Sequence, residues 1–365
     1  MNFPGIKYLP YEIKLKEPFI TSGRVIEKRK GFFICISSGG ENEIAWGEAA
    51  PLPEFGSETY SEAERALNEQ FGLLPNKEGI IEPDLFETKL SEIASLPALS
   101  HGLEQAWLGF RALKENTSLD RFLSVKLKRS VSLNGLIGLM SPGEALLRAQ
   151  MLVEQGFKTL KLKAGRSDFS EDRKSLEAIR SHFGDKIKLR LDVNGKWQFC
   201  DALNYVKELE EFNLEYIEQP VLGKEDFFNL AKISPVALAA DEIIRNSTEA
   251  FDAMGKNPGI VLILKPMMLG GIRKTLQILK AAEASGVKAV ISSSFETSLG
   301  RAMLVFLAAS LNSSMAHGIA TKDFLESEPF QDPFEIKDGS IESGSALFHG
   351  SLKPRSEFFK GRFLL

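Results

Sequence analysis

Five ionisable residues stand at the ends of successive apolar runs, and their spacing repeats. They are Lys163, Asp192, Glu218, Asp241 and Lys265, and consecutive members lie 29, 26, 23 and 24 positions apart. Each step has the length of a strand, a helix and two short loops, which predicts one charged side chain per βα unit. In a barrel of parallel strands the carboxyl ends open on one face, and active sites form there. We therefore expect the five side chains to meet in one site.

The order of the charges predicts a metal site with an amine on each side. Three clustered carboxylates repel one another unless a divalent cation neutralises them, and hard oxygen ligands suit magnesium or manganese. Asp192, Glu218 and Asp241 are the candidate ligands. Taken singly, each carboxylate also fits a turn or a helix cap. The common register with the βα repeat favours the metal site.

Two lysines share one strand of this repeat. Lys161 and Lys163 alternate with leucines, so their amines point to the same face. Inside a barrel, burial and a neighbouring cation are expected to lower the pKa of such a lysine towards that of a working base. The alternative is a surface strand with solvated lysines, because most lysines are exposed. Lys265 also fits a lysine whose charged end reaches solvent from the end of a strand.

A polar segment, Ser292–Gly300, follows the seventh strand and opens a helix. Backbone N–H groups at such a helix start could bind a substrate carboxylate. A serine-rich helix cap with Glu296 near the first turn explains the same residues. The sequence leaves both interpretations open.

Composition favours a cytoplasmic enzyme that acts on a small molecule. The net charge of −4 and the pI near 5.8 give no basic surface for nucleic acid. The longest apolar stretches are far shorter than the roughly 20 residues that span a bilayer, and no signal peptide is visible. Two separated cysteines make a disulfide unexpected, and the four histidines lack metal-ligand spacing. Nothing here predicts the oligomeric state.

Residues 1–125 carry strand patterns first and helical patterns afterwards, which predicts an α+β domain. The expected strands are Leu9–Lys16 and Gly31–Ser37, the segment Glu48–Pro53 is expected as a loop, and the expected helices are Ser61–Phe71, Pro83–Ile93 and Leu103–Lys114.

Residues 126–328 alternate short strands and helices, which predicts an α/β fold, a modified TIM barrel of the (β/α)7β type. The first strand is expected at Val131–Leu133, and an eighth near Ser314–His317 would close the ring. Residues 329–365 contain three prolines and are expected to return irregularly onto the N-terminal domain.

These motifs resemble the enolase superfamily in its muconate-lactonising-enzyme subgroup, and within it most of all the o-succinylbenzoate synthases. The resemblance covers nearly the whole chain. It rests on Lys161-x-Lys163, Asp192-x-Asn194, Glu218–Gln219–Pro220, Asp241–Glu242, Lys265–Pro266, Trp46–Pro53, Ser292–Gly300 and His317–Thr321.

The resemblance implies removal of a proton next to a carboxylate, with magnesium, or manganese in its place, stabilising the anion. It implies that Asp192, Glu218 and Asp241 bind the ion. Lys163 would take the proton and return it to the departing hydroxyl, and Lys265 would stabilise the anion from the opposite face. The implied substrate is 2-succinyl-6-hydroxy-2,4-cyclohexadiene-1-carboxylate, dehydrated to o-succinylbenzoate in menaquinone biosynthesis.

The same resemblance implies which residues contact this carboxylate substrate, namely Lys161, Arg190, Asn194, Ser293 and Glu296. It also implies that the loops Phe19–Arg24 and Pro51–Gly56 cover the barrel mouth.

Two other functions fit the same residues. A racemase of N-acylamino acids or a dipeptide epimerase would use Lys163 and Lys265 as paired acid and base, and the sequence separates it poorly from the synthase. A non-catalytic barrel that only binds a ligand would not need the lysines, so their presence argues against it.

Overall fold

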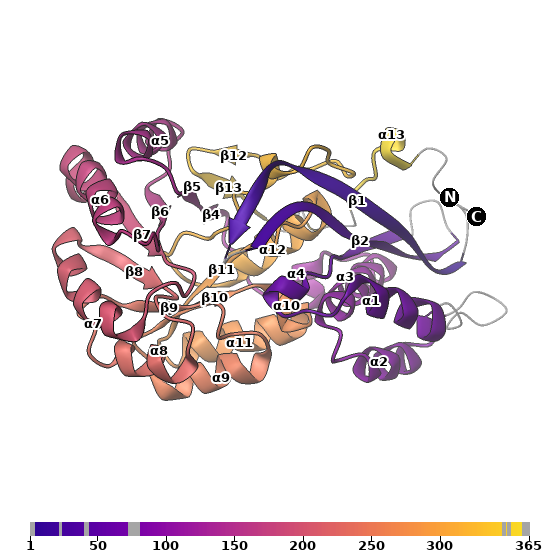
Figure 1. Cartoon of the computed structure of the whole chain (residues 1–365). Helices are drawn as coiled ribbons and strands as arrows, with labels where there is room; N and C mark the ends of the chain where they lie inside the picture. The colour runs from indigo at the N-terminus through magenta and orange to yellow at the C-terminus, as the bar shows by residue number, and fades with distance from the viewer. Residues whose placement is uncertain are drawn as a thin grey trace.

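The computed structural model describes residues 4–21, 24–39, 44–71, 81–344, 348 and 352–359. A three-stranded antiparallel sheet with helices forms the N-terminal part, and a ring of parallel strands surrounded by helices follows it (Figure 1). In the N-terminal part, β1 (Pro4–Thr21) pairs with β2 (Arg24–Ser38), which pairs with β3 (Ile44–Ala49). The helical elements are η1 (Pro53–Phe55), α1 (Tyr60–Ala66), η2 (Leu67–Phe71), α2 (Pro83–Glu92), α3 (Pro97–Lys114) and α4 (Leu119–Phe122).

The N-terminal sheet is buried on both faces, which explains its continuous apolar run. Successive side chains of a strand point to opposite faces. Phe32 and Ile34 pack with helix residues such as Trp107, whereas Phe33 packs with barrel and C-terminal residues such as Phe330. The sheet thus joins its own helices to the barrel.

Several boundaries in this part differ from those predicted, and β1 and β2 are both longer than expected. Glu48 and Ala49 belong to β3 and pair with β2, not to a loop. Helix α3 starts at Pro97, six residues before the predicted Leu103. The carboxylate of Glu58 accepts hydrogen bonds from the backbone N–H groups of residues 98 and 99 and so caps the helix from a distant segment. A cap of this kind leaves no local sequence signal.

The barrel is a sheet of seven parallel strands whose spatial order follows the sequence. Each strand is short, and each of the predicted charged residues lies at or just beyond a strand end. The strands are β5 (Asn134–Ile137), β6 (Thr159–Lys163), β7 (Lys188–Asp192), β8 (Leu214–Glu218), β9 (Leu238–Ala240), β10 (Val261–Leu264) and β11 (Lys288–Ile291).

Single parallel bridges close the ring in place of a full eighth strand. His317 pairs with Leu133, and Gly318 pairs with Ser292. The modified barrel with an N-terminal capping domain is therefore confirmed, with its last strand reduced to these bridges.

The predicted strand Val131–Leu133 is present as β4 (Ser130–Ser132) and the Leu133 bridge, but the first strand of the barrel sheet is β5, which starts at Asn134. β4 pairs instead with β13 (Ser340–Glu342), which pairs with β12 (Ile336–Lys337). The β12–β13 hairpin also corrects the expectation of an irregular C-terminal segment. Its turn, Asp338–Gly339, has φ values of +49° and +63°, and an Asp-Gly pair favours such a two-residue turn.

Helices fill the intervals between the barrel strands, as the predicted alternation requires. Within the described residues, no helix has the length and apolar character to cross a membrane. A four-residue helix after Lys265 was not predicted. The helices are α5 (Pro142–Glu154), α6 (Phe169–Phe183), α7 (Phe199–Glu208), α8 (Lys224–Ala231), α9 (Ser247–Lys256), α10 (Pro266–Leu269), α11 (Ile272–Ala284) and α12 (Ser298–Ser310).

The C-terminal segment packs against the N-terminal sheet. The ring of Phe330 lies 5.2 Å from that of Phe33 and 5.5 Å from that of Trp46, measured between centroids. Phe359, in α13 (Ser356–Phe359), lies 5.6 Å from Trp46. These aromatic contacts connect the C-terminal segment to strands β2 and β3 of the N-terminal sheet.

The residue that closes the barrel is expected to make the fold sensitive to acid. The backbone N–H of Ile291 donates to Nδ1 of the buried His317 over 3.0 Å, which requires this nitrogen to be unprotonated. Burial, and then the charges of Arg190 and Lys128, lower the pKa of His317 to about 3. The unfolded chain takes up the proton near pH 6.5, so His317 costs stability as the pH falls below that value, by about 1.4 kcal/mol per pH unit.

Comparison with His317→Gln isolates this effect, because glutamine still accepts from Ile291 but does not titrate. From pH 6.5 to 5, the free energy of unfolding of the wild type should fall relative to the variant by about 1.4 kcal/mol per unit. Urea unfolding at several pH values measures the difference. A difference that stays constant from pH 8 to 5 would contradict the assignment.

Candidate active site

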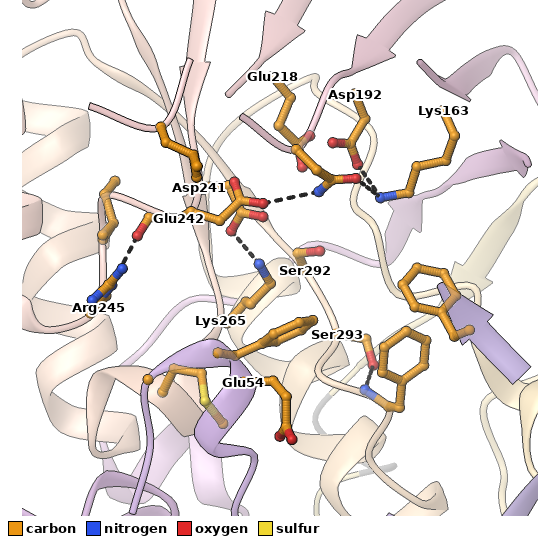
Figure 2. Close-up of a pocket in the computed structure, with 18 of the residues that line it drawn as sticks. Glu54, Lys163, Asp192, Glu218, Asp241, Glu242, Arg245, Lys265, Ser292 and Ser293 are labelled. Carbon is orange, nitrogen blue, oxygen red and sulfur yellow. Dashed lines mark hydrogen bonds and ion pairs between the residues drawn. The ribbon is translucent and has the colours of Figure 1, made fainter. Parts of the chain in front are cut away.

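A cavity of about 400 Å³ opens at the carboxyl ends of the barrel strands. The charged ends of β6, β7 and β8 and the loops after β9 and β10 line it, as Figure 2 shows. Phe19 of the β1–β2 hairpin and residues 53–56 of the N-terminal part complete the wall. The capping loops thus lie at the barrel mouth, although residues 22 and 23 of the predicted Phe19–Arg24 loop are outside the described residues.

Strand register brings Lys163, Asp192 and Glu218 together. Lys163 pairs with Asp192 across β6 and β7, and Asp192 pairs with Glu218 across β7 and β8. Oδ2 of Asp192 lies 2.9 Å from Nζ of both Lys161 and Lys163, and Lys161 also donates to Oε1 of Glu218 over 3.0 Å. The two lysines of the alternating strand therefore face one pair of carboxylates.

Asp241 and Lys265 form a second ion pair on the other side of the cavity. Asp241 follows β9, and Lys265 is the residue before α10. The ammonium of Lys265 also lies 4.7 Å from the ring centroid of Phe55, in a cation–π contact with the capping loop. All five residues of the predicted constellation thus reach one cavity.

Burial and mutual charge shift the carboxylates in opposite directions. Burial, and then the charge of Asp192, raise the pKa of Glu218 to about 8. Burial acts the same way on Asp192, but Lys161 and Lys163 outweigh it and hold the pKa of Asp192 below its usual range. The pair therefore carries less than two full negative charges near neutral pH.

The expectation that burial lowers the pKa of a lysine on this strand is wrong for Lys161. Burial does oppose the charge of Lys161, but Asp192 and Glu218 outweigh it and raise its pKa. Burial opposes the charge of Lys265 in the same way, and Asp241 raises its pKa. Both remain cations in this arrangement.

The donor set fits a hard divalent cation. Oδ1 of Asp192 is buried without a hydrogen-bond partner, and three carboxylates stand on successive strand ends. In the described part of the chain, no three acidic, histidine or cysteine side chains already converge as a finished metal site. The ammonium groups of Lys161 and Lys265 hold the carboxylates instead. Oxygen donors of this type suit magnesium.

Two predicted substrate contacts are not brought to the cavity. Arg190 is fully buried, and its guanidinium donates to Glu215 over 2.7 Å and to the carbonyl of Ala316 over 2.8 Å. Glu296 is also buried and accepts from Ser293 Oγ over 2.6 Å, inside its own loop. Neither side chain lines the cavity, so we correct both predictions. Ser293, Lys161 and Asn194 do line it.

The N–H groups at the start of α12 do not face a substrate either. Glu48 of β3 accepts from the N–H of Thr297 over 3.0 Å and of Gly300 over 2.8 Å. Glu328 accepts from the N–H of Ser298 over 2.8 Å. These N–H groups fix the N-terminal and C-terminal parts of the chain to the barrel, so they are not available to a substrate carboxylate.

Sequence reasoning missed two kinds of residue in the cavity. Glu242 follows Asp241, and burial together with the charge of Asp241 raises its pKa to about 7. Glu242 belongs to the Asp241–Glu242 motif that supports the family resemblance, but the sequence pattern offered no reason to assign it a role. Phe19 and Phe55 lie in the two loops that the resemblance places over the barrel mouth, but neither aromatic ring was given a role there.

The family models match two consecutive parts of the chain. Residues 144–346 match the model described as "Enolase C-terminal domain-like", which is more than half of the chain, and residues 5–110 match "MenC, N-terminal domain". The chain belongs to the enolase superfamily.

Individual superfamily members differ in their activity. The chain is 27% identical to the L-Ala-D/L-Glu epimerase of Bacillus subtilis, over 93% of this chain and 90% of that protein. It is 33% identical to the o-succinylbenzoate synthase of Thermobifida fusca, over 57% of this chain and 64% of that protein. It is 29% identical to the protein PHYLLO of Arabidopsis thaliana, over 91% of this chain but only 22% of that longer protein.

A solved superfamily structure matches almost the whole fold. The dipeptide epimerase of Enterococcus faecalis, complexed with Mg and the dipeptide L-Leu-L-Tyr, has a TM-score of 0.80 at 24% identity, covering 95% of this chain and 99% of that one. At this identity the match shows the fold.

Proposed function

We propose that this superfamily member is an o-succinylbenzoate synthase, which dehydrates 2-succinyl-6-hydroxy-2,4-cyclohexadiene-1-carboxylate. The N-terminal part that supplies Phe19 and Phe55 to the cavity is the part matched by the MenC N-terminal model. The similarity to the Thermobifida fusca synthase supports the same activity.

The observation that carries the proposal is the charge of a side extension of the cavity. This extension, of about 70 Å³, is lined by neutral residues such as Asn134, Leu136 and Thr321, and its charged members are Lys161 and Lys163. A dipeptide brings an ammonium group, which is costly to bury without a carboxylate beside it. The proposed substrate carries two carboxylates and no ammonium group, so the positive charge of the two lysines favours it. The extension therefore suits a dicarboxylate better than a dipeptide.

The chain's own residues divide the reaction between them. Lys161 binds the ring carboxylate, and Lys163 takes the proton from the adjacent carbon. Lys163 then returns this proton to the departing hydroxyl, so that a C–H and a C–O bond break, a double bond forms and water leaves. Lys265 stays positive and stabilises the negative charge from the opposite side. Magnesium bound by Asp192, Glu218 and Asp241 would lower the energy of the charge that develops on the carboxylate.

A dipeptide epimerase is the second candidate. It is favoured by the similarity to the Bacillus subtilis enzyme over nearly the full length of both chains. It would need Lys163 and Lys265 to act as acid and base on opposite faces of one carbon.

Substitution of Lys265 tests which role this residue has. In a one-base dehydration it must only be a cation, so Lys265→Arg should keep measurable turnover while Lys265→Met should lose at least about 10²-fold more. Arginine is a poor proton carrier, so an epimerase should be inactivated equally by both changes. The assay is the rate of dehydration, with unfolding curves as the control for folding. Equal losses in both variants would contradict the proposed role.

A further inference from the structure

Two hydrogen bonds connect Glu242 to Lys163 through a side-chain amide (Figure 2). Nζ of Lys163 donates to Oδ1 of Asn194 over 2.6 Å, and Nδ2 of Asn194 donates to Oε1 of Glu242 over 3.0 Å. An ammonium can only donate, so it requires the amide oxygen, and Glu242 accepts from the amide nitrogen. Glu242 thereby fixes which way the amide points.

The backbone around Asn194 and Glu242 is held by further hydrogen bonds. Asn194 has φ of +51° and Gly195 of +70°, the left-handed region that asparagine and glycine tolerate. The N–H of Gly195 donates to the carbonyl of Gln219 over 2.6 Å. Oε1 of Gln219 accepts from the N–H of Asp241 over 3.0 Å and of Ile243 over 3.4 Å, on either side of Glu242. These hydrogen bonds connect the loops after β7, β8 and β9 to one another.

This arrangement leaves a single direction for proton transfer at Lys163. An ammonium has three N–H bonds, and Asp192 Oδ2 at 2.9 Å and Asn194 Oδ1 at 2.6 Å hold two of them. This leaves the third bond, or the lone pair once the proton has left, for a substrate in the cavity that Lys163 lines. Lys265 likewise pairs with a carboxylate and lies beside an aromatic ring, as Lys163 does with Asp192 and Phe19. What distinguishes Lys163 is its hydrogen bond to the amide of Asn194.

We propose that Glu242 is a positioning residue for the reaction, which acts through Asn194 to aim the transferable proton of Lys163 at the substrate carbon. The inference rests on the proposed function in one respect, that Lys163 moves a proton. It adds a role for a residue that touches neither the reacting carbon nor, in this structure, the base itself.

A double-mutant cycle tests the proposal with the full-length protein and magnesium. Glu242→Ala and Asn194→Ala should each lower kcat about 10- to 100-fold with KM changed less than about threefold, because a small misalignment of a reacting group has that cost. The double variant should be no worse than Asn194→Ala by more than about threefold, since the two residues act in series. Glu242→Gln keeps an oxygen acceptor for the amide of Asn194, so its kcat should lie within about threefold of the wild type, well above that of Glu242→Ala. Glu225→Ala, an exposed carboxylate of α8, is the matched control.

Magnesium titration by calorimetry separates positioning from metal binding, because Glu242 adjoins a candidate ligand. We expect the affinity of Glu242→Ala for the ion to stay within about threefold of the wild type. Three results would each overturn the proposal. In the first, the kcat losses of the two single variants multiply in the double variant. In the others, the kcat of Glu242→Gln stays as low as that of Glu242→Ala, or saturating magnesium restores the kcat of Glu242→Ala. If the wild type does not dehydrate the cyclohexadiene, the proposed function fails by itself. The same double-mutant cycle is then measured with dipeptide epimerisation as the assay. A kcat of Glu242→Ala equal to that of the wild type would overturn the positioning role in that reaction.

Discussion

Replacing Lys163 with alanine is expected to remove essentially all turnover. The side chain takes the proton and returns it, so the variant loses both steps, and a single general acid–base residue contributes about 10²- to 10⁴-fold. That factor corresponds to about 3 to 5 kcal/mol of transition-state stabilisation. The fold should survive, because Lys161 still pairs with Asp192 at 2.9 Å and Asn194 still donates to Glu242.

Single-turnover and steady-state kinetics measure this loss, and urea unfolding verifies the fold. Lys174→Ala is the matched control, since Lys174 is an exposed lysine of α6 that pairs with Glu171 on the same helix. Its activity should equal that of the wild type. Dehydration by Lys163→Ala at close to the wild-type rate would require a different base and would end the proposed mechanism.

Removal of divalent metal should abolish activity, and magnesium or manganese should restore it. Asp192, Glu218 and Asp241 stand on successive strand ends, and their mutual repulsion favours a cation among them. Each of Asp192→Asn, Glu218→Gln and Asp241→Asn should weaken magnesium binding by more than the 10- to 100-fold that loss of an outer-shell partner costs.

Calorimetry measures the affinity, and the shift of the thermal midpoint on adding magnesium gives an independent readout. Asp201→Asn, on the exposed side of α7, should bind magnesium like the wild type. Full activity of protein shown to be free of divalent metal would contradict the site assignment.

The sequence predicted the reactive constellation because each member is tied to the local βα repeat. Lys163, Asp192 and Glu218 end strands that pair in register, and their proximity follows from that repeat alone. Arg190 shows the limit of this reasoning. It stands on the same strand as Asp192 and two residues earlier, about 6 to 7 Å further from the cavity end. There Glu215 of the neighbouring strand holds it, a partner that local pattern does not show.

Contacts between distant segments explain the other differences. Glu48 lies 249 residues from Thr297 in the sequence and accepts a hydrogen bond from its N–H at the start of α12. The helix start therefore binds the N-terminal part of the chain and not a ligand. Glu58 extends α3 in the same manner. The Asp338–Gly339 turn is the exception, since its sequence signal was present and a hairpin could have been predicted there. Sequence pattern and propensity do not show which distant segment a single side chain contacts in the folded protein.

Direct conversion of the cyclohexadiene substrate tests the proposed dehydration. Purified protein with magnesium is incubated with 2-succinyl-6-hydroxy-2,4-cyclohexadiene-1-carboxylate, and the loss of diene absorbance and the formation of o-succinylbenzoate are followed together. L-Ala-L-Glu and N-succinylamino acids are supplied in parallel, with epimerisation or racemisation followed by optical rotation. We predict rapid, chelator-sensitive formation of o-succinylbenzoate. Efficient epimerisation or racemisation with no conversion of the cyclohexadiene would contradict the account.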